Sequence, residues 1–205
     1  MNKLKNFLKF VTLSLGLLGA CTALAGASSD LKARLQSFEA LSCNFEQKVL
    51  KSNGAVVSTS QGRLLVAKPD RLMMYTASPD EQYLFTKDEA VYFYDPFVNQ
   101  VSIFSVADLN TAPFLLLNSS DPKLWAQYTV KSKGESFSLK PKSSKEFQEI
   151  ELNFKGKTLE SLVILMKNGN KNIYKLSSQQ NQVNMQDFEV AIPDDAEVDD
   201  ERRSH

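Results

Sequence analysis

Short apolar and aromatic runs fill the stretch from residue 62 to residue 104. The runs are Leu64–Ala67, Leu72–Tyr75, Tyr83–Phe85, Val91–Tyr94 and Val101–Phe104. Pro, Asp, Asn or Lys interrupts the sequence between them, which is typical of antiparallel strands joined by tight turns. Several runs are apolar at both alternating positions, so both faces of these strands need cover. One face can pack on the protein's own core, and the other is available to line a cavity.

Composition excludes several kinds of function. The 205 residues include 24 Lys and Arg and 24 Asp and Glu, so no basic excess points to a nucleic-acid partner. The single His is His205, the last residue, which argues against a Ser-His-Asp or Cys-His catalytic set. The two cysteines, Cys21 and Cys43, cannot form a Cys/His zinc site. We therefore expect neither an enzyme nor a bound cofactor or metal.

Residues 1–25 have the features of a cleaved secretory signal. Three lysines precede an apolar run of about a dozen residues, which is shorter than the ~20 residues of a membrane span. Ala23–Ala25 fits a small-x-small cleavage site, which leaves residues 26–205 as a single domain. A second possibility is a lipobox at residues 18–21, which would make Cys21 a lipidated N-terminus. The third is an uncleaved anchor.

The hydrophobic period changes within the first part of the predicted mature domain. Residues 28–38 carry apolar side chains at helical spacing, with a serine at either of the first two positions as the N-cap. Residues 41–49 alternate between apolar and polar, which predicts a strand that turns back at residues 52–54, Ser-Asn-Gly. Cys43 lies on the apolar face of this strand, and we expect it to be a buried free thiol.

Pro69 suggests a sheet that does not close. Pro69 cannot donate to a strand ladder, so it belongs at a strand end or edge, as a partly open barrel allows. The strand rhythm then stops between residues 110 and 125. Residues 114–117, Phe-Leu-Leu-Leu, are apolar on all sides and form either a buried core helix or a lid over a ligand. Asp121 and Pro122 predict the start of another short helix.

Strand signals resume in the C-terminal third. Residues 128–166 carry further alternating or apolar runs, and residues 168–170, Asn-Gly-Asn, predict a turn before the next strand. Residues 188–192 alternate again. The charged tail from residue 194 to residue 205 is expected to be loose.

These patterns predict a mainly β protein with short helices (α+β), in which a barrel-like antiparallel sheet surrounds an apolar pocket suited to lipid. Met73 and Met74 suit an adaptable wall, because thioether side chains repack around varied shapes. The alternative is that these side chains form an ordinary core. The residues expected to line the cavity or its lid are Leu64, Val66, Leu72, Met74, Leu84, Tyr92, Tyr94, Phe114, Leu115, Leu116, Leu117 and Trp125.

Three motifs carry a family resemblance. They are Gly62-x-Leu-x-Val-x-Lys-Pro, Pro79-Asp80-Glu81 and Tyr92-Phe-Tyr-Asp-Pro-Phe-Val-x-Gln100. Together they resemble the LolA-type periplasmic lipoprotein carriers, from about Asp30 to Arg203. The resemblance implies an unclosed antiparallel β-barrel with a helical lid over a hydrophobic cavity. It also implies a monomer that takes lipoproteins from an inner-membrane ABC transporter and delivers them through the periplasm to an outer-membrane receptor.

The resemblance also implies a role for Lys68. In the family, a basic residue before this Pro, usually Arg, hydrogen-bonds to backbone carbonyls of the helical lid and holds it shut. Lys68 can donate to carbonyls, and we expect its ammonium to point toward those at the ends of the short helices, but it lacks the planar fork of Arg. The alternative is an exposed lysine at a strand end.

Two other functions remain open at the level of sequence. One is an outer-membrane lipoprotein acceptor of the same fold, anchored through lipidated Cys21. The other is a hydrolase of envelope material that uses a pair of carboxylates, although the spacing of the 24 acidic residues singles out no pair.

Overall fold

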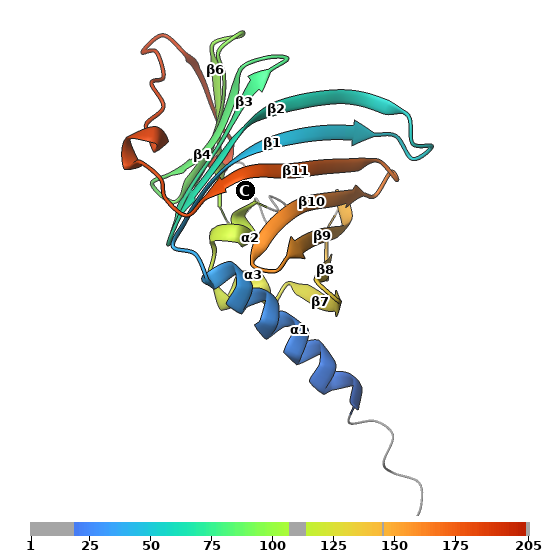
Figure 1. Ribbon diagram of the computed structural model, residues 1–205. Helices are drawn as coiled ribbons and strands as arrows, with labels where there is room; N and C mark the ends of the chain where they lie inside the picture. Colours follow the sequence, from blue (N-terminus) through green and yellow to red (C-terminus); the bar gives the residue numbers. More distant parts are fainter. Residues whose placement is uncertain (1–18, 107–113, 145, 204–205) are drawn as a thin grey trace, which may run out of the picture.

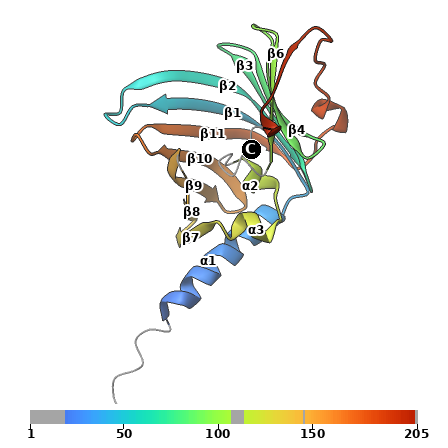
Figure 2. The same ribbon diagram turned by 180° about the vertical axis from the view of Figure 1, so that it is seen from behind.

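A single curved sheet organises the protein (Figure 1). The computed structural model describes residues 19–106, 114–144 and 146–203, with the backbone alone for residues 19–25 and 203. The strands arch over two short helices, and a longer helix runs out from beneath the arch. Seen from behind, the short helices again lie under the arch (Figure 2).

The elements follow one another from the N-terminal helix to the C-terminal strand. They are α1 Gly19–Gln36, β1 Ala40–Leu50, β2 Val56–Ala67, β3 Arg71–Ser78, β4 Gln82–Lys87, β5 Ala90–Asp95, β6 Gln100–Ser105, α2 Leu115–Asn118, α3 Pro122–Trp125, β7 Tyr128–Lys133, β8 Ser136–Pro141, β9 Phe147–Lys155, β10 Thr158–Met166, β11 Lys171–Gln180, the 3₁₀ turn η1 Met185–Phe188, β12 Glu197–Asp200 and the 3₁₀ turn η2 Glu201–Arg203.

The sheet has 12 strands in the order β12-β6-β5-β4-β3-β2-β1-β11-β10-β9-β8-β7. Its two edge strands, β12 and β7, do not pair with each other, so the barrel is unclosed, as the sequence predicted. All pairings are antiparallel except that between β12 and β6. A sheet of this size must curl because strand twist accumulates from one strand to the next.

Local chemistry places the turns where the sequence predicted them. Gly54 and Gly169 adopt positive φ at the β1–β2 and β10–β11 connections. Gly62 has a different role, because a Cβ at this position would lie 1.8 Å from the carbonyl oxygen of Tyr75 and 2.9 Å from the ring of Phe45. Glycine therefore permits the close approach of β2 and β3 beside the bulge in their pairing.

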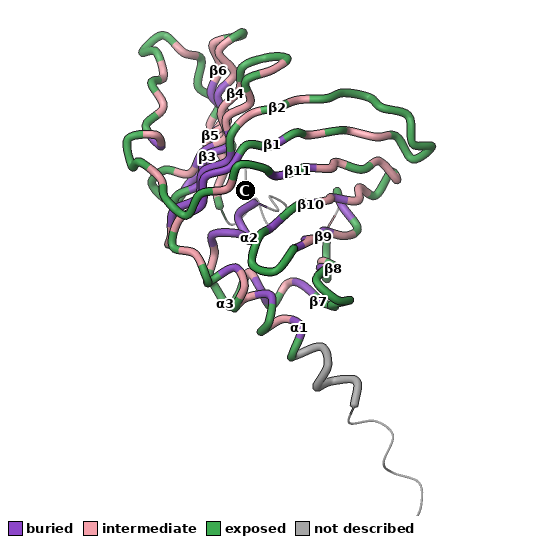
Figure 3. Tube along the Cα trace, in the orientation of Figure 1, coloured by how far each residue is buried: buried purple, intermediate pink, exposed green. Residues whose placement is uncertain are grey.

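Burial divides the apolar residues between the two faces of the sheet (Figure 3). The larger cluster, which we call the interior, joins the concave face to α1, α2 and α3. The smaller cluster lies on the opposite face of β2–β6, where the segment after β11 covers it through Val183, Phe188, Val190 and Ile192. The apolar residues of both parities are thus covered, one set by helices and the other by the C-terminal segment.

Three local predictions are wrong. Neither Ser28 nor Ser29 caps the first helix, because α1 begins at Gly19 and the Ser29 hydroxyl donates back to the Gly26 carbonyl oxygen at 3.2 Å. The alternating residues 188–192 form no strand, since they follow η1 as an irregular cover over the sheet. The charged tail is not loose throughout, because β12 pairs with β6 at residues 197–200.

The structure does not test the predictions about the N-terminus. The expected cleavage point, between Ala25 and Gly26, lies within α1, and residues 1–18 are outside the described part of the chain. Nothing is described of the Cys21 side chain. His205 and residues 107–113, which include Pro113, also lie outside it. Signal cleavage therefore stays a prediction.

Candidate functional site

The interior contains most of the side chains that the sequence assigned to a cavity or lid. It includes Leu64, Val66, Leu72, Met74, Phe114, Leu115, Leu116, Leu117 and Trp125, with Leu84 packed against it. Alternation along β2 and β3 turns one set of side chains toward the helices, since successive residues of a strand point to opposite faces. The result is a continuous apolar surface between an open sheet and three helices.

Tyr92 and Tyr94 lie elsewhere. Tyr94 belongs to the cluster on the opposite face, and Tyr92 packs against that cluster, with its ring stacked on Phe85 at 5.2 Å between centroids. The neighbouring Val91, one residue out of phase, faces the interior instead. The expected assignment of these tyrosines to the cavity side therefore differs from their position in the structure.

Helix α2 is buried in the interior. Leu116 and Leu117 are each 1% exposed, although the helix has only four residues. The Phe114 ring, just before the helix, meets Tyr174 of β11 edge-on, with 4.8 Å between centroids. Phe114 is also the N-cap residue of α2, and its side chain makes no capping hydrogen bond. Apolar packing therefore holds α2 in place.

Helix α3 is fixed more firmly. The Asp121 side chain accepts a hydrogen bond from the backbone N–H of Lys123, and Pro122 occupies the first turn, as the sequence predicted. The Trp125 indole N–H donates to the Ser119 carbonyl oxygen at 2.9 Å. The Lys32 ammonium of α1 lies 5.2 Å from the centre of the Trp125 ring. These contacts connect α3 to both other helices.

Helix α1 spans the opening between distant parts of the sheet. Leu31 and Leu35 insert into the interior. On one side, Arg34 donates to the carbonyl oxygen of Gly156, in the β9–β10 turn, at 2.8 Å, and its guanidinium lies over the rings of Phe137 and Phe154. On its other side, the end of α1 meets the end of β2. We call α1 the strap, because it joins these two parts.

Lys68 makes the contact at the β2 end of the strap. Its ammonium donates to the carbonyl oxygen of Leu35, in the last turn of α1, at 2.8 Å and lies 4.8 Å from the centre of the Phe38 ring. The carbonyls of a final helical turn have no partner within the helix, and they attract a cation. Burial lowers the pKa of Lys68 from its ordinary value, and the nearby Glu39 carboxylate partly offsets this effect.

The helix that Lys68 binds differs from the expectation. The sequence interpretation directed its ammonium toward the short helices, whereas the hydrogen bond goes to α1. The short helices are nevertheless close, because Lys68 lines a cavity of about 40 Å³ together with Leu117, Asn118 and Trp125. One cation thus sits where the strap, α2, α3 and the end of β2 converge.

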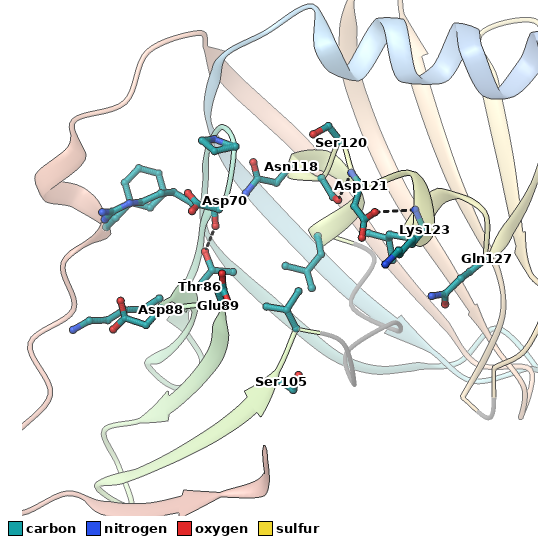
Figure 4. Close-up of a pocket in the computed structure, with 18 of the residues that line it drawn as sticks. Asp70, Thr86, Asp88, Glu89, Ser105, Asn118, Ser120, Asp121, Lys123 and Gln127 are labelled. Atoms are coloured by element: carbon teal, nitrogen blue, oxygen red, sulfur yellow. Dashed lines mark hydrogen bonds between the residues drawn. The ribbon is translucent and has the colours of Figure 1, made fainter. Parts of the chain in front are cut away.

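A polar pocket lies at the rim beside α2 (Figure 4). It has a volume of about 960 Å³ and is lined by the β2–β3 and β4–β5 turns, the end of β6, the α2–α3 region and the segment after η1. Sequence periodicity did not reveal this pocket, because its walls are turns. Most of the residues that line it have polar side chains, although apolar atoms make up the larger part of its exposed surface. Asp70, Thr86, Asn118 and Asp121 are among its residues.

The described residues contain few groups suited to metal binding or catalysis. Across residues 19–106, 114–144 and 146–203, no group of three or more His, Cys, Asp or Glu side chains is placed to hold a metal. Cys43 is a buried free thiol, and desolvation raises its pKa to about 12. Among the same residues, no helix is both long and apolar enough to cross a membrane.

The sequence matches a family model over residues 36–190, and that family is described as the outer membrane lipoprotein carrier protein LolA. The chain belongs to the LolA family. It is 36% identical over 206 residues to an outer-membrane lipoprotein carrier protein of Yersinia enterocolitica, covering 98% of this chain and 100% of that protein. A carrier of the same name from Yersinia pestis is 36% identical over 193 residues, covering 91% of this chain and 94% of that one.

Solved structures support the family's fold. An uncharacterised conserved protein of Thermus thermophilus superposes with a TM-score of 0.56 at 13% identity, covering 84% of this chain and 98% of that one. A LolA superfamily protein of Nitrosomonas europaea gives a TM-score of 0.51 at 12% identity, covering 80% and 97%. At such low identity these likenesses concern the fold alone.

Proposed function

We propose that this chain is a periplasmic chaperone that shields the acyl chains of lipoproteins and carries them from the inner membrane to a receptor at the outer membrane. The supporting observation is the interior itself, an apolar surface bounded on one side by helix α2, which is held by apolar packing and has no side-chain cap. The relatives named outer-membrane lipoprotein carrier proteins belong to the same family. An inner-membrane ABC transporter is the proposed donor of cargo.

The physical need for a carrier follows from solvation. Each acyl methylene exposed to water costs about 0.8 kcal/mol, so several chains of membrane length cost tens of kcal/mol. Leu116 and Leu117 of α2 occupy the space that such chains need. Cargo therefore exchanges with the protein's own side chains, and the apolar surface is never left open to water.

Two-step reconstitution tests this function. The mature chain is incubated with membranes that contain the transporter and a lipoprotein, and soluble complex is then offered to receptor-bearing membranes. We expect lipoprotein in the soluble fraction only when the chain is present, and its transfer in the second step. Failure to solubilise any lipoprotein would rule out carriage.

The acceptor anchored through Cys21 is not favoured, because the similar full-length proteins are named carriers. Cell fractionation with intact-mass measurement separates the two functions. The carrier should start near Gly26 and be released with the periplasm. A membrane-bound form acylated on Cys21 would support the acceptor instead.

A further inference from the structure

We propose that the polar pocket beside α2 holds the first residues of the cargo polypeptide, directly after its acylated cysteine, and that Asn118 hydrogen-bonds their peptide groups. This inference rests on the proposed function, since it assumes that acyl chains enter the interior. It concerns the part of the lipoprotein that the interior cannot accept, because a peptide buried there would lose its hydrogen bonds to water.

Helix α2 separates the pocket from the interior. Asn118 lines the pocket, Leu116 and Leu117 are buried in the interior, and Leu115, one helical turn before Asn118, belongs to both. A lipoprotein has its apolar and polar parts joined at one cysteine. The pocket side of this helical turn suits the polypeptide of the lipoprotein, and its interior side suits the acyl chains.

Asn118 supplies an independent observation. Its residue is 5% exposed, and its amide oxygen is buried without a hydrogen-bond partner among the described residues. In Figure 4 the side chain points from α2 toward the β2–β3 turn at Asp70. Asn118 lines both this pocket and the small cavity beside Lys68. A buried acceptor with no donor is costly to maintain, so Asn118 marks a place where a ligand can supply an N–H group.

Several neighbouring polar groups are already hydrogen-bonded. The Ser119 hydroxyl accepts from the backbone N–H of Asp121 at 3.0 Å, and Asp121 accepts from that of Lys123 at 2.8 Å. The Thr86 hydroxyl donates to the Asp70 carbonyl oxygen at 2.6 Å and accepts from the Leu72 N–H at 2.9 Å. These bonds hold the walls in shape, whereas the buried Asn118 oxygen has no donor among the described residues.

Charge favours a peptide over an anionic headgroup. The pocket mixes the basic residues Arg71, Lys87 and Lys123 with the acidic residues Asp70, Asp88, Glu89, Asp121 and Glu189. Arg71 also lies 3.6 Å from the Glu189 carboxylate, which partly neutralises it. An excess of acidic groups repels phosphate, whereas a neutral backbone with donors and acceptors is compatible with mixed walls. The volume of about 960 Å³ suits a short peptide.

Two synthetic probes test this inference on the mature chain. One is an N-palmitoyl, S-dipalmitoylglyceryl cysteine methyl ester, and the other carries the same lipid followed by six Ser and Gly residues. Affinities are measured by displacement of a fluorescent apolar dye. Asn118→Leu should bind the methyl ester within about twofold of wild type. It should bind the lipopeptide about 3- to 10-fold more weakly, the loss of one hydrogen bond.

Site-specific cross-linking provides a second measurement that does not depend on the Asn118 variant. Ser120→Cys places a thiol at the pocket, and Ser58→Cys places a matched exposed thiol on β2, away from it. A lipopeptide with a bromoacetyl group on its third residue should react several-fold faster with Ser120→Cys. Excess methyl ester should abolish that difference by occupying the interior.

The outcomes separate the two levels of the proposal. Equal effects of Asn118→Leu on both probes, or equal cross-linking of both cysteines, would overturn the peptide site while leaving acyl-chain carriage intact. If neither probe displaces the dye from wild type, the proposed function itself fails, and the peptide site fails with it.

Discussion

Lys68 occupies the position at which the family resemblance implies arginine, and its contacts explain how a lysine can serve there. A single carbonyl, that of Leu35, accepts its bond at 2.8 Å, so the second arm of a guanidinium is not required for this contact. The Phe38 ring lies 4.8 Å away and favours a cation over its face. Both partners belong to the end of the strap or the turn after it.

Replacing Lys68 by Leu should weaken the closed state without unfolding the chain. A hydrogen bond from a charged donor contributes about 1.5–3 kcal/mol at most, and partial exposure places Lys68 at the lower end of that range. We expect about a tenfold larger open population, normal loading and slower hand-off, because an exposed apolar mouth retains the chains. The two-step reconstitution measures both steps.

Lys68→Arg is the matched control and should support both steps. If Lys68→Leu equals wild type in loading and in hand-off, the contact with Leu35 does not control the closed state, and packing of the helices alone does so.

Cys43 lies in the interior, so the reactivity of its thiol reports when the interior opens. Desolvation raises its pKa from an ordinary value near 9 to about 12, so at pH 9 the folded protein holds roughly 500-fold less thiolate than an exposed thiol would. Alkylation by iodoacetamide at pH 9 should therefore be slow in wild type and faster in Lys68→Leu. Mass spectrometry measures the rate, and wild-type labelling as fast as in denaturant would contradict burial.

The raised pKa of Cys43 makes the free energy of unfolding depend on pH. Because the folded pKa lies above the unfolded value, the buried neutral thiol contributes its full stability below about pH 9. That contribution falls as the pH rises toward about 12. Comparing urea midpoints of wild type and Cys43→Ala at pH 8 and pH 10.5 checks the sign, and a larger wild-type advantage at pH 10.5 would refute it.

At the scale of elements, α2 and the segment after β11 bury apolar residues on opposite faces of the sheet. Substitutions in the two elements should therefore affect ligand binding differently. Leu116→Glu places a carboxylate in the interior, which costs several kcal/mol and expels α2 or repels acyl chains. Ile192→Ala removes most of a side chain that packs on the opposite face and should cost about 2 kcal/mol. We expect at least tenfold weaker lipopeptide binding for Leu116→Glu, and binding within about twofold of wild type for Ile192→Ala.

Urea denaturation with dye displacement measures both effects, and Leu116→Ala provides a milder change if the glutamate variant does not fold. A foldable Leu116→Glu chain that loads cargo normally would show that α2 does not meet the ligand.

Sequence predicted the strands, the turns and the short helices well, because period-two alternation and turn residues act locally. It could not tell which parity faces the helices, since Val91 and Tyr92 are both apolar and the same alternation fits either face. It also misjudged residues 188–192, where alternate side chains reach the sheet without any ladder of hydrogen bonds. The pocket beside α2 depends on five segments that no local pattern brings together.

At the scale of the whole molecule, the open sheet and the strap act together. The sheet cannot close on itself, so the interior depends on α1 to join the β2 end, through Lys68, to the β9–β10 turn, through Arg34. Releasing the Lys68 contact frees one end of the strap while the guanidinium of Arg34, over Phe137 and Phe154, retains the other. We propose that this asymmetry allows the interior to open without global unfolding.

Cargo should therefore stabilise the whole chain even though it displaces α2. A ligand that binds only the folded state adds about 2.7 kcal/mol at a hundred times its Kd, and for a domain of this size each kcal/mol shifts Tm by about 2–4 °C. We expect the tailed lipopeptide to raise Tm by roughly 5–10 °C and the same peptide without lipid to have no effect. Differential scanning calorimetry measures both. If the lipopeptide displaces the apolar dye but leaves Tm unchanged, the chains bind folded and unfolded protein equally, and the interior between sheet and strap is not their site.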